Sequence, residues 1–297
     1  MELKHIKGNT WVIVANELIP LYLLGDGRCV MLDSGLARER EELESTLQQA
    51  GLSLAGILCT HAHVDHCANN DYFQKKYHIP VALTAPEAGM CSSILNLKCY
   101  RLLVTPGVAE QEMSEMVHTP DVIIPYEDGT LTMAGAEFGI VTTPGHSSGH
   151  ICIITPDNVC YAGDAIMSRE MLEAKLPYSL AIQAAMESRK KLATLDCDVF
   201  VMAHKGTIPG CEIEELVEEN HQLIFRRLEQ IKALITEPMH FSRICQLVYR
   251  NFGLRSTRAR RALYYERNIR FFVEYLLDQD QLDILCRDGV AYYAPKA

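Results

Sequence analysis

The stretch "CTHAHVDHCANN", residues 59–70, carries three histidines and one aspartate within six positions: His61, His63, Asp65 and His66. The apolar run "AGILCT" at 55–60 precedes them and predicts a short strand that ends at the first of these histidines. Functional side chains of α/β proteins gather where strands end and loops begin. Imidazole nitrogens and carboxylate oxygens at this spacing can point at a common ion, so the stretch predicts a metal site.

Three further apolar segments lead to residues of the same ligand types. "AEFGIVTTPG" leads to His146, "NVCYAG" to Asp164 and "CDVFVMA" to His204. Five histidines and two aspartates favour zinc, with iron and manganese as alternatives, because calcium and magnesium prefer all-oxygen ligand shells. Seven ligands are more than one tetrahedral ion needs, so the set predicts two neighbouring divalent ions.

The motif "THAHVDH" resembles the H-x-H-x-D-H signature of the metallo-β-lactamase superfamily. "VMLDSG" at 30–35 precedes it as in that family, and three further motifs follow in the family's order: "TPGHSSGH" at 143–150, "YAGDA" at 161–165 and "MAHKG" at 202–206. The resemblance covers residues 10–206, about two thirds of the chain. Five separated motifs in one order make the resemblance specific.

The resemblance implies an α/β fold of the αββα sandwich type, with the metal site at one edge of two packed sheets. Carried over position by position, it implies one ion held by His61, His63 and His146, a second held by Asp65, His66 and His204, and a bridge at Asp164. In the mechanism it implies, a hydroxide shared by the ions attacks the substrate, because two cations lower the pKa of water toward ~7.

The resemblance also implies roles for neighbouring residues. Asp65 would orient the attacking water or carry its proton, in addition to binding metal. Asp33 would hydrogen-bond the loop beneath the metals, and His150 would support a ligand from behind. Tyr178 lies in the loop after Asp164, where related enzymes place substrate contacts.

The composition of the whole chain argues against several classes of protein. The chain has 297 residues, of which 48% are hydrophobic, a net charge of −10 and eleven cysteines. The negative charge disfavours broad binding to nucleic acids or anionic membranes, and no apolar run approaches the ~20 residues of a membrane span. Scattered cysteines are typical of a reducing compartment, and the N-terminal segment has no apolar signal core. These features predict a globular cytoplasmic protein.

The chain divides near residue 210 into two predicted domains, 1–210 and 211–297. The first alternates strand and helix signals and contains every candidate ligand; its residues 86–118 are predicted to be mostly helical, with a break at Pro106-Gly107. The second has three predicted helices, at 211–236, 241–252 and 257–279, followed by a predicted hairpin that turns at "RDG". This order is typical of a winged-helix-like module.

An arginine-rich run lies in the second domain. Between positions 240 and 270 the chain has one glutamate and eight arginines: Arg243, Arg250, Arg255, Arg258, Arg260, Arg261, Arg267 and Arg270. The simpler interpretation is a solvated helix face that pairs with the acidic helix predicted at 211–230. The alternative is an anion-binding patch for a phosphate, a coenzyme A tail or an RNA backbone.

The ligand set and the resemblance together predict an enzyme with a small-molecule substrate. The region from "TPGHSSGH" to "YAGDA" looks most like the hydroxyacylglutathione hydrolase (glyoxalase II) branch, which implies hydrolysis of a small thioester or ester. The basic glutathione-binding residues of that branch find no match, so a coenzyme A thioester fits equally.

Two alternative functions stay open. An endoribonuclease or phosphodiesterase of the same fold would bind nucleic acid through the arginine run, although the net charge of −10 opposes it. A persulfide dioxygenase of the same superfamily would use one iron ion with fewer ligands, although all seven positions are filled here. The oligomeric state is not predicted.

Overall fold

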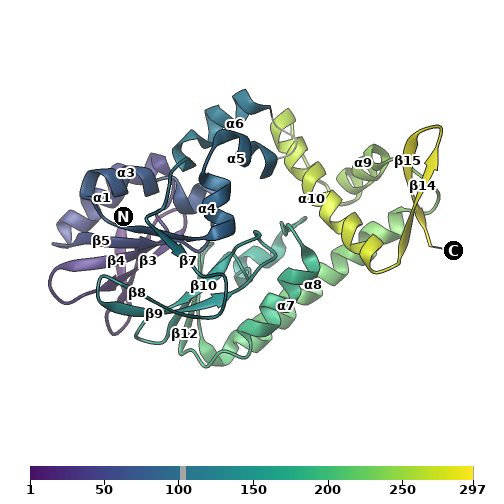
Figure 1. Ribbon diagram of the computed structural model, residues 1–297. Coiled ribbons are helices and arrows are strands. Elements are labelled where there is room, and N and C mark those ends of the chain that lie inside the picture. The colour runs from purple at the N-terminus through teal and green to yellow at the C-terminus, as the bar shows by residue number, and fades with distance from the viewer. Residues whose placement is uncertain (101–104, 297) are drawn as a thin grey trace.

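The computed structural model describes residues 1–100 and 105–296. Two β-sheets pack face to face, helices cover both outer faces, and a helical module extends from one end of this sandwich (Figure 1). The predicted α/β sandwich with a smaller, mainly helical C-terminal region is therefore confirmed. None of the helices in these residues combines the length and the apolar character needed to cross a membrane.

The first sheet has seven strands in sequential order: β1 (Glu2–Lys7), β2 (Thr10–Val14), β3 (Leu18–Leu23), β4 (Arg28–Leu32), β5 (Ser53–Leu58), β6 (Val81–Thr84) and β7 (Val122–Ile124). Strands β1 to β4 are antiparallel, whereas β4 to β7 are parallel. The carboxyl ends of parallel strands meet at one edge of a sheet. Asp33 after β4 and His61 after β5 consequently reach the same edge.

The second sheet has six strands in the order β13-β12-β11-β10-β9-β8: β8 (Gly129–Met133), β9 (Ala136–Thr142), β10 (Ile151–Ile154), β11 (Val159–Gly163), β12 (Val199–Met202) and β13 (Gly206–Pro209). Its one parallel pair within the described residues is β11 with β12. Asp164 and His204 follow these two strands directly, so they emerge side by side.

Alternating side chains of the strands build the layers, because successive residues of a strand face opposite sides. Between the sheets, Leu58 and Val30 pack against Phe138 and Tyr161. The outer face of the first sheet is covered by three helices, α1 (Arg40–Gln49), α3 (Asn70–Tyr77) and α4 (Ala85–Cys91). The outer face of the second is covered by α7 (Ile182–Leu192) and the start of α8 (Ile213–Leu234).

Helix α2 (Val64–Cys67) follows β5 directly. Within 86–118 the described residues are mostly helical, as predicted: α4, α5 (Ile94–Tyr100) and α6 (Pro106–Met113). The expected break at Pro106-Gly107 lies one residue earlier, because Thr105 is not helical and Pro106 begins α6. Proline fits the first helical position, because the N–H that it lacks would have no acceptor within the helix there. The Thr105 side chain accepts a hydrogen bond from the Val108 N–H and caps this helix. The part of the prediction that falls on 101–104 lies outside the described residues.

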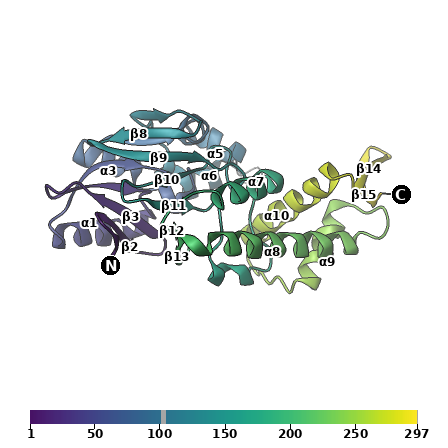
Figure 2. The same cartoon turned by 90° about the horizontal axis from the view of Figure 1, so that it is seen from below.

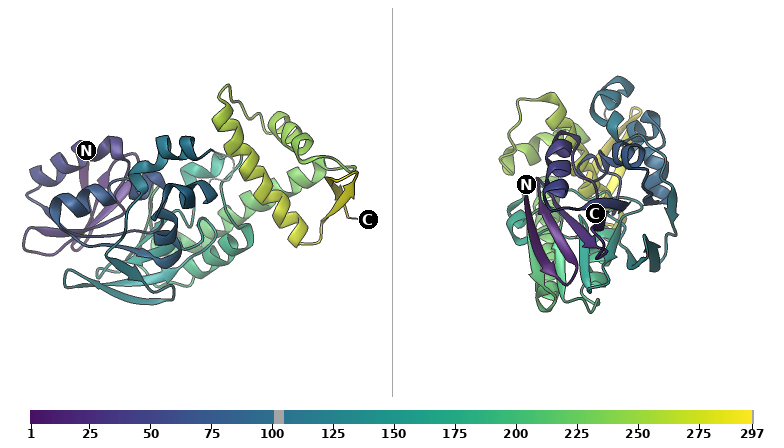
Figure 3. Two further views of the ribbon diagram at one scale, coloured as in Figure 1. Left: turned by 45° about the horizontal axis from the view of Figure 1, so that its top comes forward. Right: turned by 90° about the vertical axis from the view of Figure 1, so that its left-hand side faces the viewer.

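Short 3-10 helices complete the sandwich: Ala37–Glu39, Ser114–Met116, Arg169–Glu173 and Gly210–Glu212. Beyond it, the C-terminal module consists of the second half of α8, α9 (Phe241–Asn251), α10 (Ala259–Asp278) and the hairpin of β14 (Leu282–Arg287) and β15 (Val290–Pro295). These elements extend away from the sandwich in Figure 2 and in the left view of Figure 3.

Helix α8 joins the two regions. Its Leu216 packs in the outer core of the second sheet, whereas Ile224 and Leu228 pack with Phe272 in a second core. This second core also includes Ile182 and Met186 of α7, so it joins the module to the sandwich. Three helices and a hairpin follow the order predicted for a winged-helix-like module. That resemblance, and the predicted division at residue 210, stay predictions.

Candidate metal centre

The structure brings all seven predicted ligands to one edge of the sandwich. They lie in the segments that follow β5, β9, β11 and β12: His61, His63, Asp65, His66, His146, Asp164 and His204. Their ligand atoms form two groups, and within each group all atoms lie within 4.8 Å of one another. The first group contains His61, His63, His146 and Asp164, and the second contains Asp65, His66 and His204.

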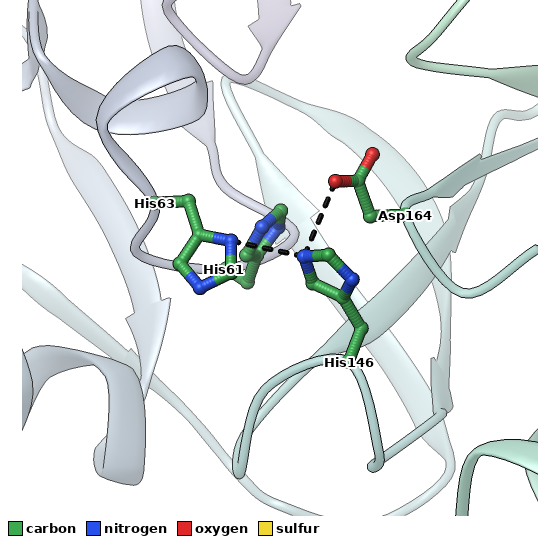
Figure 4. A group of neighbouring side chains, drawn as sticks. All are labelled: His61, His63, His146 and Asp164. Carbon is green, nitrogen blue, oxygen red and sulfur yellow. Dashed lines mark hydrogen bonds and ion pairs between the residues drawn. The ribbon is translucent and has the colours of Figure 1, made fainter. Parts of the chain in front are cut away.

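In the first group, the side chains point toward one another (Figure 4). His146 Nε2 lies 2.9 Å from His63 Nδ1 and 3.2 Å from Asp164 Oδ2. Two nitrogen ligands of a tetrahedral zinc ion, at 2.0–2.1 Å from the metal, stand about 3.3 Å apart. The spacing in the first group therefore matches that of a single coordination sphere.

Asp164 also faces the second group. Its Oδ1 lies 3.6 Å from His66 Nε2, and its Oδ2 lies 3.1 Å from His204 Nε2. The carboxylate of Asp65 lies 3.7 Å from His204 Nε2 and 4.0 Å from His66 Nε2. Asp164 thus stands between the two groups, where a bridging carboxylate would stand; the assignment of each ligand to an ion stays a prediction.

Buried polar atoms in this cluster support a metal fit. Within residues 1–100 and 105–296, His61 Nε2, His66 Nε2 and Asp164 Oδ1 are buried and have no hydrogen-bond partner. Each buried polar atom left without a partner costs about 1–3 kcal/mol. Coordination would satisfy these atoms, and imidazole with carboxylate is a donor set that zinc, iron and manganese accept. The residues therefore fit a pair of such ions.

Asp33 holds the floor of the site. Its carboxylate accepts hydrogen bonds from the Thr60 N–H at 2.7 Å, the Thr60 hydroxyl at 2.8 Å and His66 Nδ1 at 2.7 Å. Because the Thr60 hydroxyl donates to Asp33, its oxygen accepts from His61 Nδ1 at 3.0 Å. These bonds fix both imidazoles with Nε2 turned toward the cluster, which is the arrangement that carboxylate partners impose on metal-binding histidines.

His150 supports Asp164 through the main chain. Its Nε2 accepts from the Asp164 N–H at 3.1 Å, and its Nδ1 donates to the Thr143 hydroxyl at 2.8 Å. Gly163 makes this approach feasible, because it has a φ of 49° and a Cβ there would lie 2.9 Å from His150 Nε2. Burial lowers the pKa of His150 to about 4, so the ring is neutral and can accept this bond.

Two glutamates that the sequence analysis missed complete the support. Glu87 of α4 is fully buried and accepts from the Ala62 N–H at 2.8 Å, the Ser147 hydroxyl at 2.6 Å and the Gly149 N–H at 2.7 Å. It thereby ties the loop of His61 to the loop of His146. Glu17, before β3, pairs with His204 Nδ1. Neither glutamate lies in a recognisable motif.

Burial and charge pull the histidines in opposite directions. Burial lowers the pKa of His61 well below its usual value and that of His146 to about 3, so both rings are neutral with a free lone pair. Burial also opposes the charged form of His204, but hydrogen bonds with Asp164 and Glu17 outweigh it and raise its pKa to about 10. A metal ion must displace that proton, so metal binding releases protons.

A cavity of about 320 Å³ opens over the cluster. Its mouth is formed by Tyr100, Tyr178, Tyr264 and Arg267, the last two from α10. The Tyr178 hydroxyl lies 2.7 Å from that of Tyr100, and the Tyr100 hydroxyl contacts His63 Nε2. The guanidinium of Arg267 lies 4.7 Å from the ring centre of Tyr178. Tyr178 thus sits where the predicted substrate contact would be, whereas Tyr100 was missed.

The simpler interpretation of the arginine run is wrong for Arg260. That residue pairs with Glu112 of α6, and the acidic start of α8 pairs instead with Arg169, through Glu212, Glu215 and Glu219. Another cavity, of about 530 Å³, is lined by Arg255, Arg258, Arg260 and Arg261. It shares Tyr264 with the cavity over the cluster.

Comparison with known proteins gives relatives of moderate similarity. The chain is 27% identical to the "Probable metallo-hydrolase YqgX" of Bacillus subtilis over 62% of its own length and 83% of that protein. It is 25% identical to a hydroxyacylglutathione hydrolase of Shewanella pealeana, over 63% of its own length and 61% of that protein. The chain therefore matches only about three fifths of that hydrolase.

Solved structures show the same fold. A metallo-beta-lactamase family protein from Thermus thermophilus superposes with a TM-score of 0.70 at 21% identity, covering 94% of this chain and 93% of that one. The family profile described as Metallo-beta-lactamase superfamily matches residues 8–204, which include every residue of the two ligand groups. The chain belongs to the metallo-beta-lactamase superfamily.

Proposed function

We propose that this protein is a dinuclear metal-dependent hydrolase of small thioesters or esters, similar to the glyoxalase II branch of its superfamily. The observation that carries the proposal is the position of Asp164, between two ligand groups and at the wall of a small cavity. A cavity of about 320 Å³ suits a small substrate. The similarity to a hydroxyacylglutathione hydrolase supports a thioester.

The metal ligands and Asp65 would have different roles in the reaction. Two bound divalent ions lower the pKa of water toward ~7 and polarise a carbonyl oxygen. Asp65 lines the cavity, and burial raises its pKa, so its carboxylate is suited to orient the attacking water and accept its proton. The water oxygen joins the acyl carbon, the carbon–sulfur bond breaks, and the thiol leaves with a proton.

Other parts of the proposal follow from the ligand set and the composition. Zinc is the proposed metal, with iron and manganese as alternatives. The proposed catalytic domain is 1–210, and 211–297 is the proposed winged-helix-like domain that shapes the mouth of the cavity. All eleven cysteines are free thiols, in keeping with our proposed location in the cytoplasm. The proposed partner is a small molecule, with a nucleic acid as the less favoured alternative, and no membrane partner is proposed.

The test is the hydrolysis of a panel of acyl thioesters by protein whose metal content has been measured. The reaction is monitored through the absorbance of the thioester itself, because the protein's own thiols react with thiol dyes. Lactoylglutathione and short acyl-coenzyme A esters form the panel, and His61→Ala is the control. We expect activity in the wild type and its loss in the control. The proposal would be contradicted if the protein, with two metals bound, cleaves RNA or other phosphodiesters but no thioester.

A further inference from the structure

A second cavity, of about 210 Å³, lies beside the metal cluster. Three candidate ligands line both this cavity and the cavity over the cluster: His146, Asp164 and His204. A substrate bound over the cluster could therefore extend into the second cavity. Its remaining wall is mostly apolar: Ile166, Met167, Met171, Ala174, Leu176, Pro177 and Tyr178. A water molecule occupies about 30 Å³, so the cavity holds roughly seven groups of that size.

Arg189 is the exception in this apolar wall. It lies on α7 with only 3% of its surface exposed, and its Nε donates to the Ala165 carbonyl at 3.1 Å. Its Nη1 is buried and, in the described part of the chain, has no hydrogen-bond partner. No described carboxylate forms an ion pair with Arg189 either, in contrast to Arg169 and Arg260.

An unpaired buried cation is costly, because its desolvation is not offset by an opposite charge. A ligand with a negative charge would offset this cost, and a guanidinium matches the two oxygens of a carboxylate. The candidate metal ligands thus line both cavities, and the wall of the second cavity also carries a cation. A substrate that fills both must be reactive at one end and anionic at the other.

We propose that this second cavity is the acyl pocket and that Arg189 binds a carboxylate at the far end of a short acyl chain. The substrate class is then the monothioester of a short dicarboxylic acid, such as a succinyl or glutaryl thioester. Met167, Met171 and Leu176 contact the methylene groups, and the thioester carbonyl lies over the metal cluster. This inference rests on the proposed thioester hydrolysis for its reaction, but the binding of a carboxylate by Arg189 stands on its own geometry.

The test compares thioesters that share one thiol carrier and differ only in the acyl end, glutaryl against pentanoyl. We expect the wild type to prefer glutaryl at least tenfold in kcat/KM. Arg189→Met removes the charge and keeps the apolar stem, and it should abolish this preference, so that the ratio of the two kcat/KM values falls to about one. Arg189→Lys should restore part of the preference. A purely structural role of Arg189 would lower both activities alike.

Arg227→Met is the matched control. Arg227 also donates to a main-chain carbonyl, that of Ala174, at 3.1 Å, but it is not among the described residues lining the cavity. We expect this variant to keep the glutaryl preference. Ala174→Phe reduces the cavity and leaves Arg189 in place, and it should lose glutaryl hydrolysis while acetyl thioester hydrolysis stays within a few fold.

A binding measurement separates this inference from the proposed function. Calorimetric titration of the metal-loaded protein with glutarate should show binding that is at least tenfold tighter than that of butanoate, and Arg189→Met should remove the difference. Glutarate binding without any thioester hydrolysis would support the pocket and overturn the proposed reaction. Thioester hydrolysis with equal use of both acyl ends, and no effect of Arg189→Met on glutarate binding, would overturn the pocket and leave the proposed function standing.

Discussion

The sandwich and the C-terminal module contribute to the same cavity in different ways. The sandwich supplies all seven candidate ligands from strand ends and short loops, and Asp33, Glu87 and His150 hold them from behind. The module supplies Tyr264 and Arg267, both from α10. The difference indicates that the chemistry resides in the sandwich, whereas the module adjusts which molecule reaches it.

The largest effect is expected where the two ligand groups meet. Asp164→Asn should lower activity at least ~100-fold and disrupt the metal pair, because a neutral amide binds and bridges cations poorly. The measurement is thioester hydrolysis together with metal analysis of the same preparation. A variant with full activity and two bound metals would show that Asp164 does not bridge, and the chemistry would have to be sought elsewhere.

A smaller effect should follow from a residue behind the ligands. Glu87→Gln puts an amide NH₂ group where the carboxylate accepts three hydrogen bonds, so the loops of His61 and His146 lose their common anchor. We expect metal affinity to fall about 10- to 100-fold, measured by competition with a chromophoric chelator. Glu110→Gln, on the exposed surface of α6, is the control. Unchanged affinity in Glu87→Gln would remove this glutamate from the account.

The module should affect substrate binding alone. Arg267→Met removes the cation that stacks on Tyr178 at the mouth. We expect KM for a thioester to rise about tenfold, while kcat stays within about twofold and metal content is unchanged. Arg250→Met, on α9, is the matched control within the same module. A loss of kcat or of metal in Arg267→Met would mean that the module takes part in the chemistry, which would break the division between the two regions.

The smallest predicted effect is the loss of stability of the metal-free protein as the pH falls. The pKa of His150 is about 4 in the folded protein because the ring is buried, against an ordinary value of 6.5. The unfolded chain therefore binds more protons as the pH falls below 6.5, and stability declines until the pH approaches 4. Lowering the pH from 7 to 6 should therefore reduce the free energy of unfolding by about 0.7 kcal/mol through this group.

Denaturant unfolding of chelator-treated protein at the two pH values measures this cost. The control is His150→Gln, which cannot titrate and should lose correspondingly less stability over the same interval. The other histidines are common to both proteins, so their opposing pKa shifts cancel in the comparison. Equal pH dependence of the wild type and His150→Gln would show that this ring is not buried in its neutral form.

The ligands could be predicted because each stands next to an apolar strand that is legible in the sequence. "AGILCT", "NVCYAG" and "CDVFVMA" became β5, β11 and β12. Asp164 and His204 emerge side by side because β11 and β12 are parallel neighbours, and His61 joins them because the sheet that contains β5 packs against theirs. The strand pattern predicted which side chains stand at strand ends, whereas the αββα sandwich and the grouping of the ligands were expected from the resemblance to the metallo-β-lactamase superfamily.

Residues whose role depends on distant partners could not be predicted in this way. Glu87 meets partners 25 and 60 residues away, and Arg260 pairs with Glu112 and not with the helix that follows the sandwich. Arg189 lies on an amphipathic helix, where its neighbours in sequence give no sign of a cavity. Pairings of this kind depend on how whole elements pack, which no short motif records.

The most direct test of the account is the number of metal ions bound per chain. Protein stripped with a chelator and titrated with zinc, then analysed by native mass spectrometry, should bind two ions. His63→Ala and His204→Ala, one from each ligand group, should each bind one tightly. A wild type that holds a single ion, with both variants losing it alike, would contradict the paired centre and favour a mononuclear one.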